Sequence, residues 1–255
     1  LPTPAVMFND RPDLRREMNA WMNAELYKAP DCVGAIYVMP GDTVEDIEAM
    51  ITNPQIRGFK CYHQSAKTDG PTWLAEVQQY LPESAWQVAN ERGMSITIHM
   101  VRPDALSDEK NMAYFQQMCA KYPKAKLILA HCARGFAAWT AVDSIRKLAG
   151  LDNVWYDFAA VCEAAPMAAC SRATGGRRVL WGSDYPICMH RGRVISWGMG
   201  YLWLIDEMVE EENACVLAAE NLQATRLACS LLDLDATQVQ DIFYNNAAEL
   251  FHLAP

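Results

Sequence analysis

Two histidines and one aspartate stand where apolar runs of this 255-residue chain end. His99 closes Ser-Ile-Thr-Ile-His, His131 closes Leu-Ile-Leu-Ala-His, and Asp184 closes Val-Leu-Trp-Gly-Ser-Asp. Imidazole and carboxylate groups bind divalent metal ions and carry protons, so these residues could support metal-assisted or acid–base chemistry. Short runs of apolar and β-branched residues predict strands buried on both faces. A polar residue at the carboxyl end of such a strand lies where barrel enzymes hold their active sites.

The strands that would position these residues recur about every 30 residues, with helical stretches between them. We expect seven of them, at residues 5–8, 34–39, 58–62, 95–100, 127–132, 153–158 and 179–184. Regular alternation of strand and helix without a linker predicts one α/β domain over residues 1–255, with the (β/α)₈ or TIM-barrel architecture. A doubly wound sheet is the alternative fold, but no Gly-x-Gly-x-x-Gly follows any expected strand.

Helix boundaries are also readable from the sequence. Pro12 predicts a helix start, Asp42 with Glu45 predicts a capping box, Ser107 predicts the start of another helix, and Gly175 predicts a helix end. After the last expected strand, the pattern predicts a C-terminus made of helices alone.

These C-terminal helices are expected over residues 197–232 and 237–251. Seven strands are one fewer than the barrel needs for closure. We expect the missing strand to be the first, because the opening Leu-Pro-Thr-Pro-Ala-Val looks like the entry to a second strand.

Arginines follow several of the expected strand ends. A guanidinium can form two parallel hydrogen bonds with a carboxylate. Arg134 and Arg193, and after them Arg102, are therefore candidates for binding an anionic substrate. The alternative is that these arginines form ion pairs with acidic residues of the same chain.

Two further residues are candidates for lining the pocket. Lys60 lies near the end of the run Gly-Phe-Lys-Cys-Tyr, although a lysine extending from a barrel rim or pairing with Asp184 is the alternative. Tyr185 follows Asp184 directly and could lean over a flat substrate, whereas packing at the rim is the simpler role for such a ring.

The composition restricts the class of partner. A net charge of −9 and a pI near 5.0 disfavour binding to nucleic acid or to a membrane surface, so a small molecule is expected. Nine cysteines, odd in number and without a Cys-x-x-Cys pair, predict free thiols in a reducing compartment. With no leader-like segment or apolar run long enough to cross a bilayer, we expect a soluble cytoplasmic protein.

Four fragments, in this order, resemble the second amidohydrolase family, which includes aminocarboxymuconate semialdehyde decarboxylase and several lactonases. They are Ile-Thr-Ile-His-Met, Leu-Ile-Leu-Ala-His-Cys-Ala-Arg-Gly-Phe, Val-Leu-Trp-Gly-Ser-Asp-Tyr-Pro and the terminal Asn-Asn-Ala-Ala-Glu-Leu-Phe. The resemblance implies that His99 binds a divalent metal ion, with Zn²⁺ expected. It also implies that His131 binds the ion or acts as an acid–base beside it, and that Asp184 binds the ion and takes the proton of the attacking water.

One feature of the family is missing. The family carries a His-x-His pair on its first strand, and these 255 residues contain no His-x-His. One absent N-terminal βα unit would explain both this and the strand count, so we expect the parent sequence to contain such a unit. Since a zinc site uses three protein ligands with a water, the sequence as given supplies at most half of a mononuclear site.

The resemblance implies a hydrolase in which a metal-activated water attacks a small carboxylated ester, lactone or amide. A second interpretation is a lyase, a non-oxidative decarboxylase of an unsaturated or aromatic acid on the same scaffold. A third is a barrel that binds small molecules without catalysis. The expected partners are a small carboxylated substrate and a second copy of the chain in a homodimer.

Overall fold

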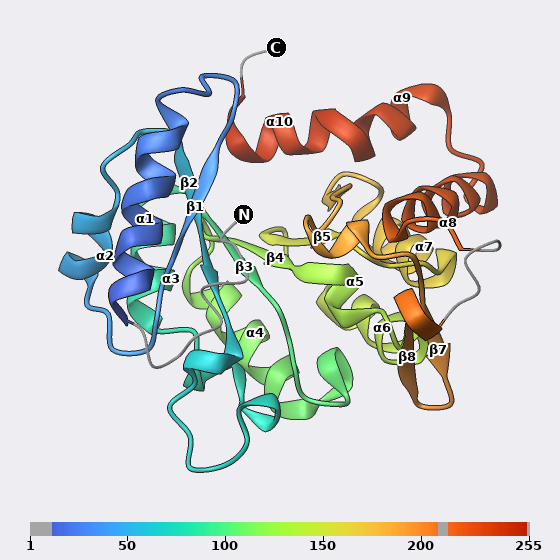
Figure 1. Cartoon of the computed structure of the whole chain (residues 1–255), viewed down its shortest axis with the longest axis horizontal. Helices are drawn as coiled ribbons and strands as arrows, with labels where there is room; N and C mark the ends of the chain where they lie inside the picture. The colour runs from blue at the N-terminus through green and yellow to red at the C-terminus, as the bar shows by residue number, and fades with distance from the viewer. Residues whose placement is uncertain (1–11, 209–213, 254–255) are drawn as a thin grey trace. The chain divides into compact units, whose positions relative to one another are not determined.

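The computed structural model describes residues 12–208 and 214–253, and Figure 1 draws its elements. The chain divides into two compact units, which are described separately. Unit 1 contains the described residues up to Arg102, with Glu109–Ile128 and Leu151–Asn153. Unit 2 contains Pro103–Asp108, Leu129–Gly150 and the described residues from Val154 onward. That residues 1–255 form one domain stays a prediction.

Six of the seven expected strands are present, while residues 5–8 lie outside the described residues. Their order in the sheet is their order in the chain: β1 (Gly34–Tyr37), β2 (Ile56–Cys61), β3 (Ser95–Ile98), β4 (Lys126–Leu129), β5 (Val154–Asp157) and β6 (Val179–Leu180). The pairs β1–β2, β2–β3 and β5–β6 are parallel. Parallel strands with helices between them confirm the predicted α/β fold.

Unit 1 contributes one helix before β1 and the helices that lie between the first four strands. These are α1 (Pro12–Leu26), α2 (Val44–Met50), α3 (Glu83–Arg92) and α4 (Glu109–Lys121), with short 3₁₀ turns η2 (His63–Ser65), η3 (Thr72–Leu74) and η4 (Val77–Gln79). The predicted capping box is shifted by one residue, because Thr43 and Asp46 form it at α2. The Asp42 carboxylate instead accepts hydrogen bonds from Met39 N at 2.7 Å and from Arg15 Nη1 at 2.5 Å.

Helix α1 is attached to β1 by an asparagine side chain. The Asn19 amide donates to the Tyr37 carbonyl oxygen at 2.9 Å and accepts from the Tyr37 N–H at 2.8 Å. Asn19 is buried, so this pair satisfies polar groups that would otherwise carry a desolvation cost. The amide thus takes the place of a neighbouring strand at this residue.

Unit 2 contains the remaining elements. They are η5 (Ala105–Ser107), α5 (Ala130–Arg134), α6 (Ala138–Ser144), η6 (Ile145–Leu148), α7 (Ala164–Thr174), η7 (Ile187–Met189), η8 (Asp206–Met208), α8 (Leu217–Leu231), α9 (Ala236–Gln240), a π-helical turn η9 (Asp241–Asn245) and α10 (Asn246–Phe251). Gly175 ends α7 as predicted, with φ of 61° in the left-handed region. Ser107 closes η5, and α4 begins two residues later at Glu109.

The prediction of helices alone after Asp184 is wrong for residues 192–205. There, β7 (Gly192–Trp197) and β8 (Gly200–Ile205) form an antiparallel hairpin, labelled in Figure 1. Both arms are rich in β-branched and aromatic residues, and Gly198 takes a φ of 56° at the turn. This combination is a hairpin signal that outweighs the weak helical periodicity. The rest of the C-terminus is helical, as predicted.

The terminal Asn-Asn-Ala-Ala-Glu-Leu-Phe motif attaches the C-terminal helices to β6. The buried Asn246 side chain donates to the carbonyl oxygens of Gly176 and Val179, both at 2.8 Å. Trp181 N, just beyond β6, donates to the Ile242 carbonyl oxygen at 2.9 Å. Across the described ranges, no helix is both long and apolar enough to cross a membrane.

Close packing between β2 and β3 gives a stability prediction. A Cβ atom added at Gly58 would lie 2.1 Å from Ser95 Oγ and 2.9 Å from the Ser95 carbonyl oxygen. The hydroxyl can rotate away but the backbone oxygen cannot, so Gly58→Ala should lower the free energy of unfolding by about 1–3 kcal/mol in chemical denaturation. Gly150→Ala is the matched control, since its new Cβ would meet no atom within 4 Å. Equal losses of stability in the two variants would contradict this account of the packing.

Candidate active site

His131 lies in a strained turn directly after β4. His131, Cys132 and Ala133 have φ values of 58°, 51° and 59°, and Arg134 follows with φ of 62°. The segment α5 is therefore left-handed from His131 onward. Each residue with a Cβ costs about 1–2 kcal/mol in this conformation, and such strain is found mainly where function requires it.

Three contacts fix the His131 residue. Its backbone N–H donates to Asp157 Oδ1 at 2.8 Å, and its ring Nδ1 lies 2.8 Å from the Ala159 carbonyl oxygen. The Phe136 ring stacks on the imidazole with 4.9 Å between centroids. Since a carbonyl oxygen only accepts, Nδ1 carries the proton and Nε2 of the neutral ring carries the lone pair.

Asp157 is a functional candidate that the sequence analysis missed. It closes β5, and its Oδ1 accepts from both His131 N and Ala159 N, the latter at 3.1 Å. The signal was available, because Asp157 ends the apolar run Val-Trp-Tyr in the same way that Asp184 ends its own.

Asp184 also takes a left-handed conformation, with φ of 62°. It lies four residues beyond the end of β6, is half-buried, and accepts a hydrogen bond on its backbone oxygen from Cys188 N at 3.1 Å. Its neighbour Tyr185 is 68% exposed. The two residues are adjacent in the chain, but only Asp184 is withdrawn from the surface.

Arg134 meets the β7–β8 hairpin. Its Nη2 donates to the Tyr201 hydroxyl at 2.8 Å, and its guanidinium carbon lies 5.3 Å from the Tyr201 ring centroid. The Tyr201 and Trp203 rings pack on Phe136 at centroid distances of 5.4 Å and 5.2 Å. Phe136 in turn covers His131, so one aromatic cluster links both residues.

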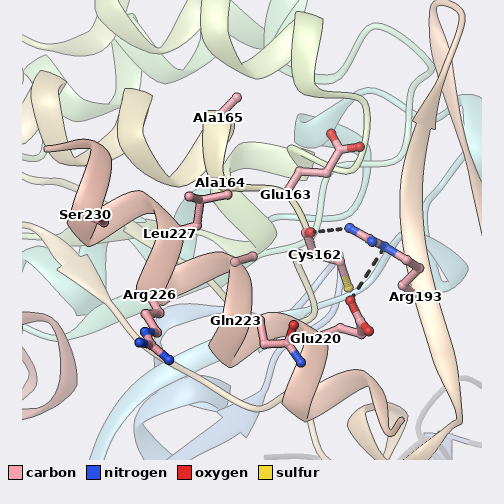
Figure 2. A pocket seen from close by; sticks show the side chains of 11 residues that line it. Cys162, Glu163, Ala164, Ala165, Arg193, Glu220, Gln223, Arg226, Leu227 and Ser230 are labelled. Carbon is pink, nitrogen blue, oxygen red and sulfur yellow. Dashed lines mark hydrogen bonds and ion pairs between the residues drawn. The ribbon is translucent and has the colours of Figure 1, made fainter. Parts of the chain in front are cut away.

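Arg193 occupies a different place, shown in Figure 2. A cavity of about 930 Å³ is lined by residues around the start of α7, by α8 and by Arg193 of β7. There Arg193 Nη2 donates to the Cys162 carbonyl oxygen at 3.0 Å, and its Nε lies 3.7 Å from Glu220 Oε2. His131 and Asp184 are not among the residues that line this cavity.

Two cysteines near these residues, Cys132 and Cys162, are protonated at neutral pH. All nine cysteines are free thiols. Burial raises the pKa of Cys162 to about 11. Burial, followed by the contact with Cys170, raises the pKa of Cys132 well above its ordinary value. Neither thiol therefore has the thiolate character of a nucleophile.

In unit 1, the Tyr62 ring lies near both the Lys60 ammonium group and the His99 ring. Lys60 is buried on β2, with Nζ 5.0 Å from the Tyr62 ring centroid. The Tyr62 and His99 rings are 6.3 Å apart, as expected from the register, which pairs Cys61 with Ile98 one residue earlier.

His99 and Arg102 also form hydrogen bonds that involve backbone oxygens in unit 1. The Tyr80 hydroxyl donates to the His99 carbonyl oxygen at 3.1 Å. Arg102 Nη1 donates to the Leu74 carbonyl oxygen at 3.1 Å.

The donor chemistry of these residues suits a divalent metal ion in part. A metal-ligating histidine ordinarily donates its other ring N–H to a carbonyl or carboxylate, and His131 has this arrangement through Ala159. His99 belongs to unit 1, whereas His131 and Asp184 belong to unit 2. Within residues 12–208 and 214–253, no group of three His, Cys, Asp or Glu side chains is assembled to hold a metal ion.

Several solved structures are similar to this chain. An amidohydrolase from Burkholderia multivorans with bound zinc is 14% identical, covers 94% of this chain and 80% of its own, and has a TM-score of 0.61. The 5-carboxyvanillate decarboxylase from Novosphingobium aromaticivorans was solved in complex with manganese and 4-hydroxy-3-methoxy-5-nitrobenzoic acid. It is 17% identical, covers 98% of this chain and 74% of its own, and has a TM-score of 0.60. The 4-oxalomesaconate hydratase from Rhodopseudomonas palustris is 13% identical, covers 96% of this chain and 73% of its own, and has a TM-score of 0.62.

At these identities, the likeness shows the fold that this chain shares with those enzymes. A comparison with curated protein sequences gave no match. The model of the amidohydrolase family, however, matches residues 9–253. Because this match spans nearly the whole sequence and includes every strand-end residue described above, the chain belongs to the amidohydrolase family.

Proposed function

We propose that this chain is a metal-dependent hydrolase that acts on a small carboxylated ester, lactone or amide. The orientation of His131 is the observation that supports this most. A buried imidazole held at its backbone, at Nδ1 and on its ring face keeps its Nε2 lone pair in one direction. Such fixed orientation is what a ligand or proton carrier requires.

In this proposal, His99, His131 and Asp184 are each candidate ligands of a divalent ion, with Zn²⁺ the expected metal. When bound, such an ion supplies a Lewis acid and lowers the pKa of water to about 7. Asp184 would accept the proton of the attacking water and return it to the leaving group. His131 Nε2 would serve as a ligand or pass a proton beside Asp184.

Arg134 is the proposed residue for the substrate carboxylate. It is half-buried and lies on the same short turn as His131, so a bound acid would lie close to the reacting carbon. Arg193, Arg102, Lys60 and Tyr185 remain candidates for substrate binding. Of these, Arg193 already has a backbone acceptor and the Glu220 carboxylate beside it, which favours Arg134.

Decarboxylation is a second candidate, favoured by the aromatic cluster of Phe136, Tyr201 and Trp203 beside His131. In that reaction, the bond from carbon to the carboxylate breaks and its electron pair stays on the substrate carbon. Asp184 or His131 would then protonate that carbon. Product analysis with a lactone and with a hydroxybenzoate separates the reactions, because hydrolysis consumes water and decarboxylation releases CO₂.

The metal assignment predicts two different mutant phenotypes. His99→Ala should lose bound divalent ion, because it removes a ligand. Asp184→Asn should abolish turnover with a smaller effect on folding, because the amide cannot accept the proton. Elemental analysis, kinetics and thermal unfolding of the purified variants provide the measurements.

His252→Asn, at the exposed end of α10, is the control and should leave metal content and turnover unchanged. If His99→Ala keeps stoichiometric metal and full activity, the ligand assignment is wrong.

The carboxylate assignment predicts a loss that is specific for acids. Arg134→Lys should raise KM by about one to two powers of ten for a carboxylated substrate, with kcat less affected, because a point charge lacks the bidentate fork. The methyl ester of the same substrate should show little change. Steady-state kinetics on acid and ester give the comparison.

Arg193→Lys should be measured in parallel, and Arg146→Lys is the control, because Arg146 is exposed and does not line the cavity around Arg193. Should both Arg134→Lys and Arg193→Lys discriminate between acid and ester as the wild type does, the anionic-substrate proposal would be abandoned.

A further inference from the structure

The β7–β8 hairpin is fixed to the segment that follows His131. The side chain of Ser196 in β7 binds the main chain of that segment, because its Oγ accepts a hydrogen bond from Ala138 N at 2.9 Å. The same hydroxyl donates to Glu163 Oε2 at 2.7 Å, and Ser196 N donates to Glu163 Oε1 at 2.9 Å. These three hydrogen bonds hold the hairpin at its β7 arm.

Aromatic contacts hold the β8 arm against the same segment. Phe136 is 4% exposed and lies between the hairpin rings and the His131 imidazole. Tyr201 and Trp203 are half-buried, and each packs on Phe136. A change in the hairpin can thus reach His131 through the Phe136 ring.

Tyr201 has a second contact that Trp203 lacks. Its hydroxyl accepts a hydrogen bond from Arg134 Nη2 at 2.8 Å, and its ring lies beneath the guanidinium at 5.3 Å. An arginine side chain has many rotamers, so one hydrogen bond and one ring face together remove most of its freedom. Fixing the guanidinium before a ligand arrives lowers the entropic cost of binding.

We infer that Tyr201 is a positioning residue that holds the Arg134 guanidinium in the orientation required for a substrate carboxylate. The hairpin then determines specificity for acids over the corresponding esters, although Tyr201 itself need not touch the carboxylate. The claim that Arg134 binds a substrate carboxylate rests on the proposed function, whereas the claim that Tyr201 positions Arg134 does not.

Chemical modification tests the positioning without any substrate. In the full-length, metal-loaded protein, phenylglyoxal should modify Arg134 roughly 3- to 10-fold faster in Tyr201→Phe than in the wild type, because the hydrogen bond is lost. Mass spectrometry of the digested protein measures the rate, with the exposed Arg146 as an internal reference in each sample. An unchanged Arg134 rate in Tyr201→Phe overturns the inference.

Two further variants serve as controls for the modification rate. Tyr201→Gln carries an amide oxygen that can accept from Arg134, so it should restore a slow rate if the hydrogen bond is responsible. Tyr27→Phe is a matched control, because Tyr27 is exposed in unit 1 and its hydroxyl bonds Thr52. If Tyr201→Gln and Tyr201→Phe react equally fast, the hydrogen bond does not position Arg134.

Calorimetric binding of 4-hydroxybenzoate and its methyl ester tests the carboxylate part. In Tyr201→Phe, the dissociation constant of the acid should rise roughly 3- to 10-fold, and that of the ester should change less than about twofold. Equal weakening of acid and ester, or no weakening of the acid, overturns the role of Tyr201 in acid specificity. A wild type that binds the acid no better than the ester overturns carboxylate recognition, while the phenylglyoxal rates still decide the positioning.

Discussion

The Asp157 carboxylate holds the turn that carries His131, and the other features of the site depend on this interaction. Four consecutive residues with Cβ atoms, His131 to Arg134, have positive φ, at a cost of about 1–2 kcal/mol each. A hydrogen bond from His131 N to the Asp157 carboxylate, and a backbone hydrogen bond from Gly135 N to the His131 carbonyl oxygen at 2.5 Å, offset part of this cost. Cys132 and Ala133 are fully buried, and this burial offsets a further part of the strain energy. The strain is thus confined to a turn that the surrounding structure fixes.

The turn brings together two functional groups that an ordinary strand would send to opposite faces. Residues three apart on a helical turn lie on one side, so His131 and Arg134 both reach the cluster around Phe136. In a chain of net charge −9, a half-buried guanidinium is a local exception that can attract an anion. With His131 as the proposed proton carrier and Arg134 as the proposed anion-binding group, this turn suits the function proposed above, an enzyme of the amidohydrolase family that acts on small acids.

The strands could be predicted from the sequence because buried parallel strands are short and mainly apolar runs, a pattern that β1 to β6 have except for β2, which contains Arg57 and Lys60. The hairpin at residues 192–205 was missed because its β7 arm mixes polar and apolar residues, and its Gly-Met turn was not weighed against helical periodicity. The position of His131 at a strand end could be predicted, but its tautomer could not, because the carbonyl of Ala159 comes from another strand end. Arg193 likewise follows a strand in sequence, yet long-range contacts with Cys162 and Glu220 set its surroundings. Residue type and strand position are local properties, whereas partners depend on tertiary structure.

The tautomer of His131 tests the central claim most directly, because it depends on the Asp157 turn and on the Ala159 carbonyl together. Nitrogen-15 NMR of histidine-labelled protein, with His131→Asn used for assignment, reports which ring nitrogen carries the proton in the neutral imidazole. The account predicts a protonated Nδ1 and an unprotonated Nε2 for His131. A proton on Nε2, with Nδ1 unprotonated, would show that the Ala159 carbonyl does not orient this ring and would contradict the account.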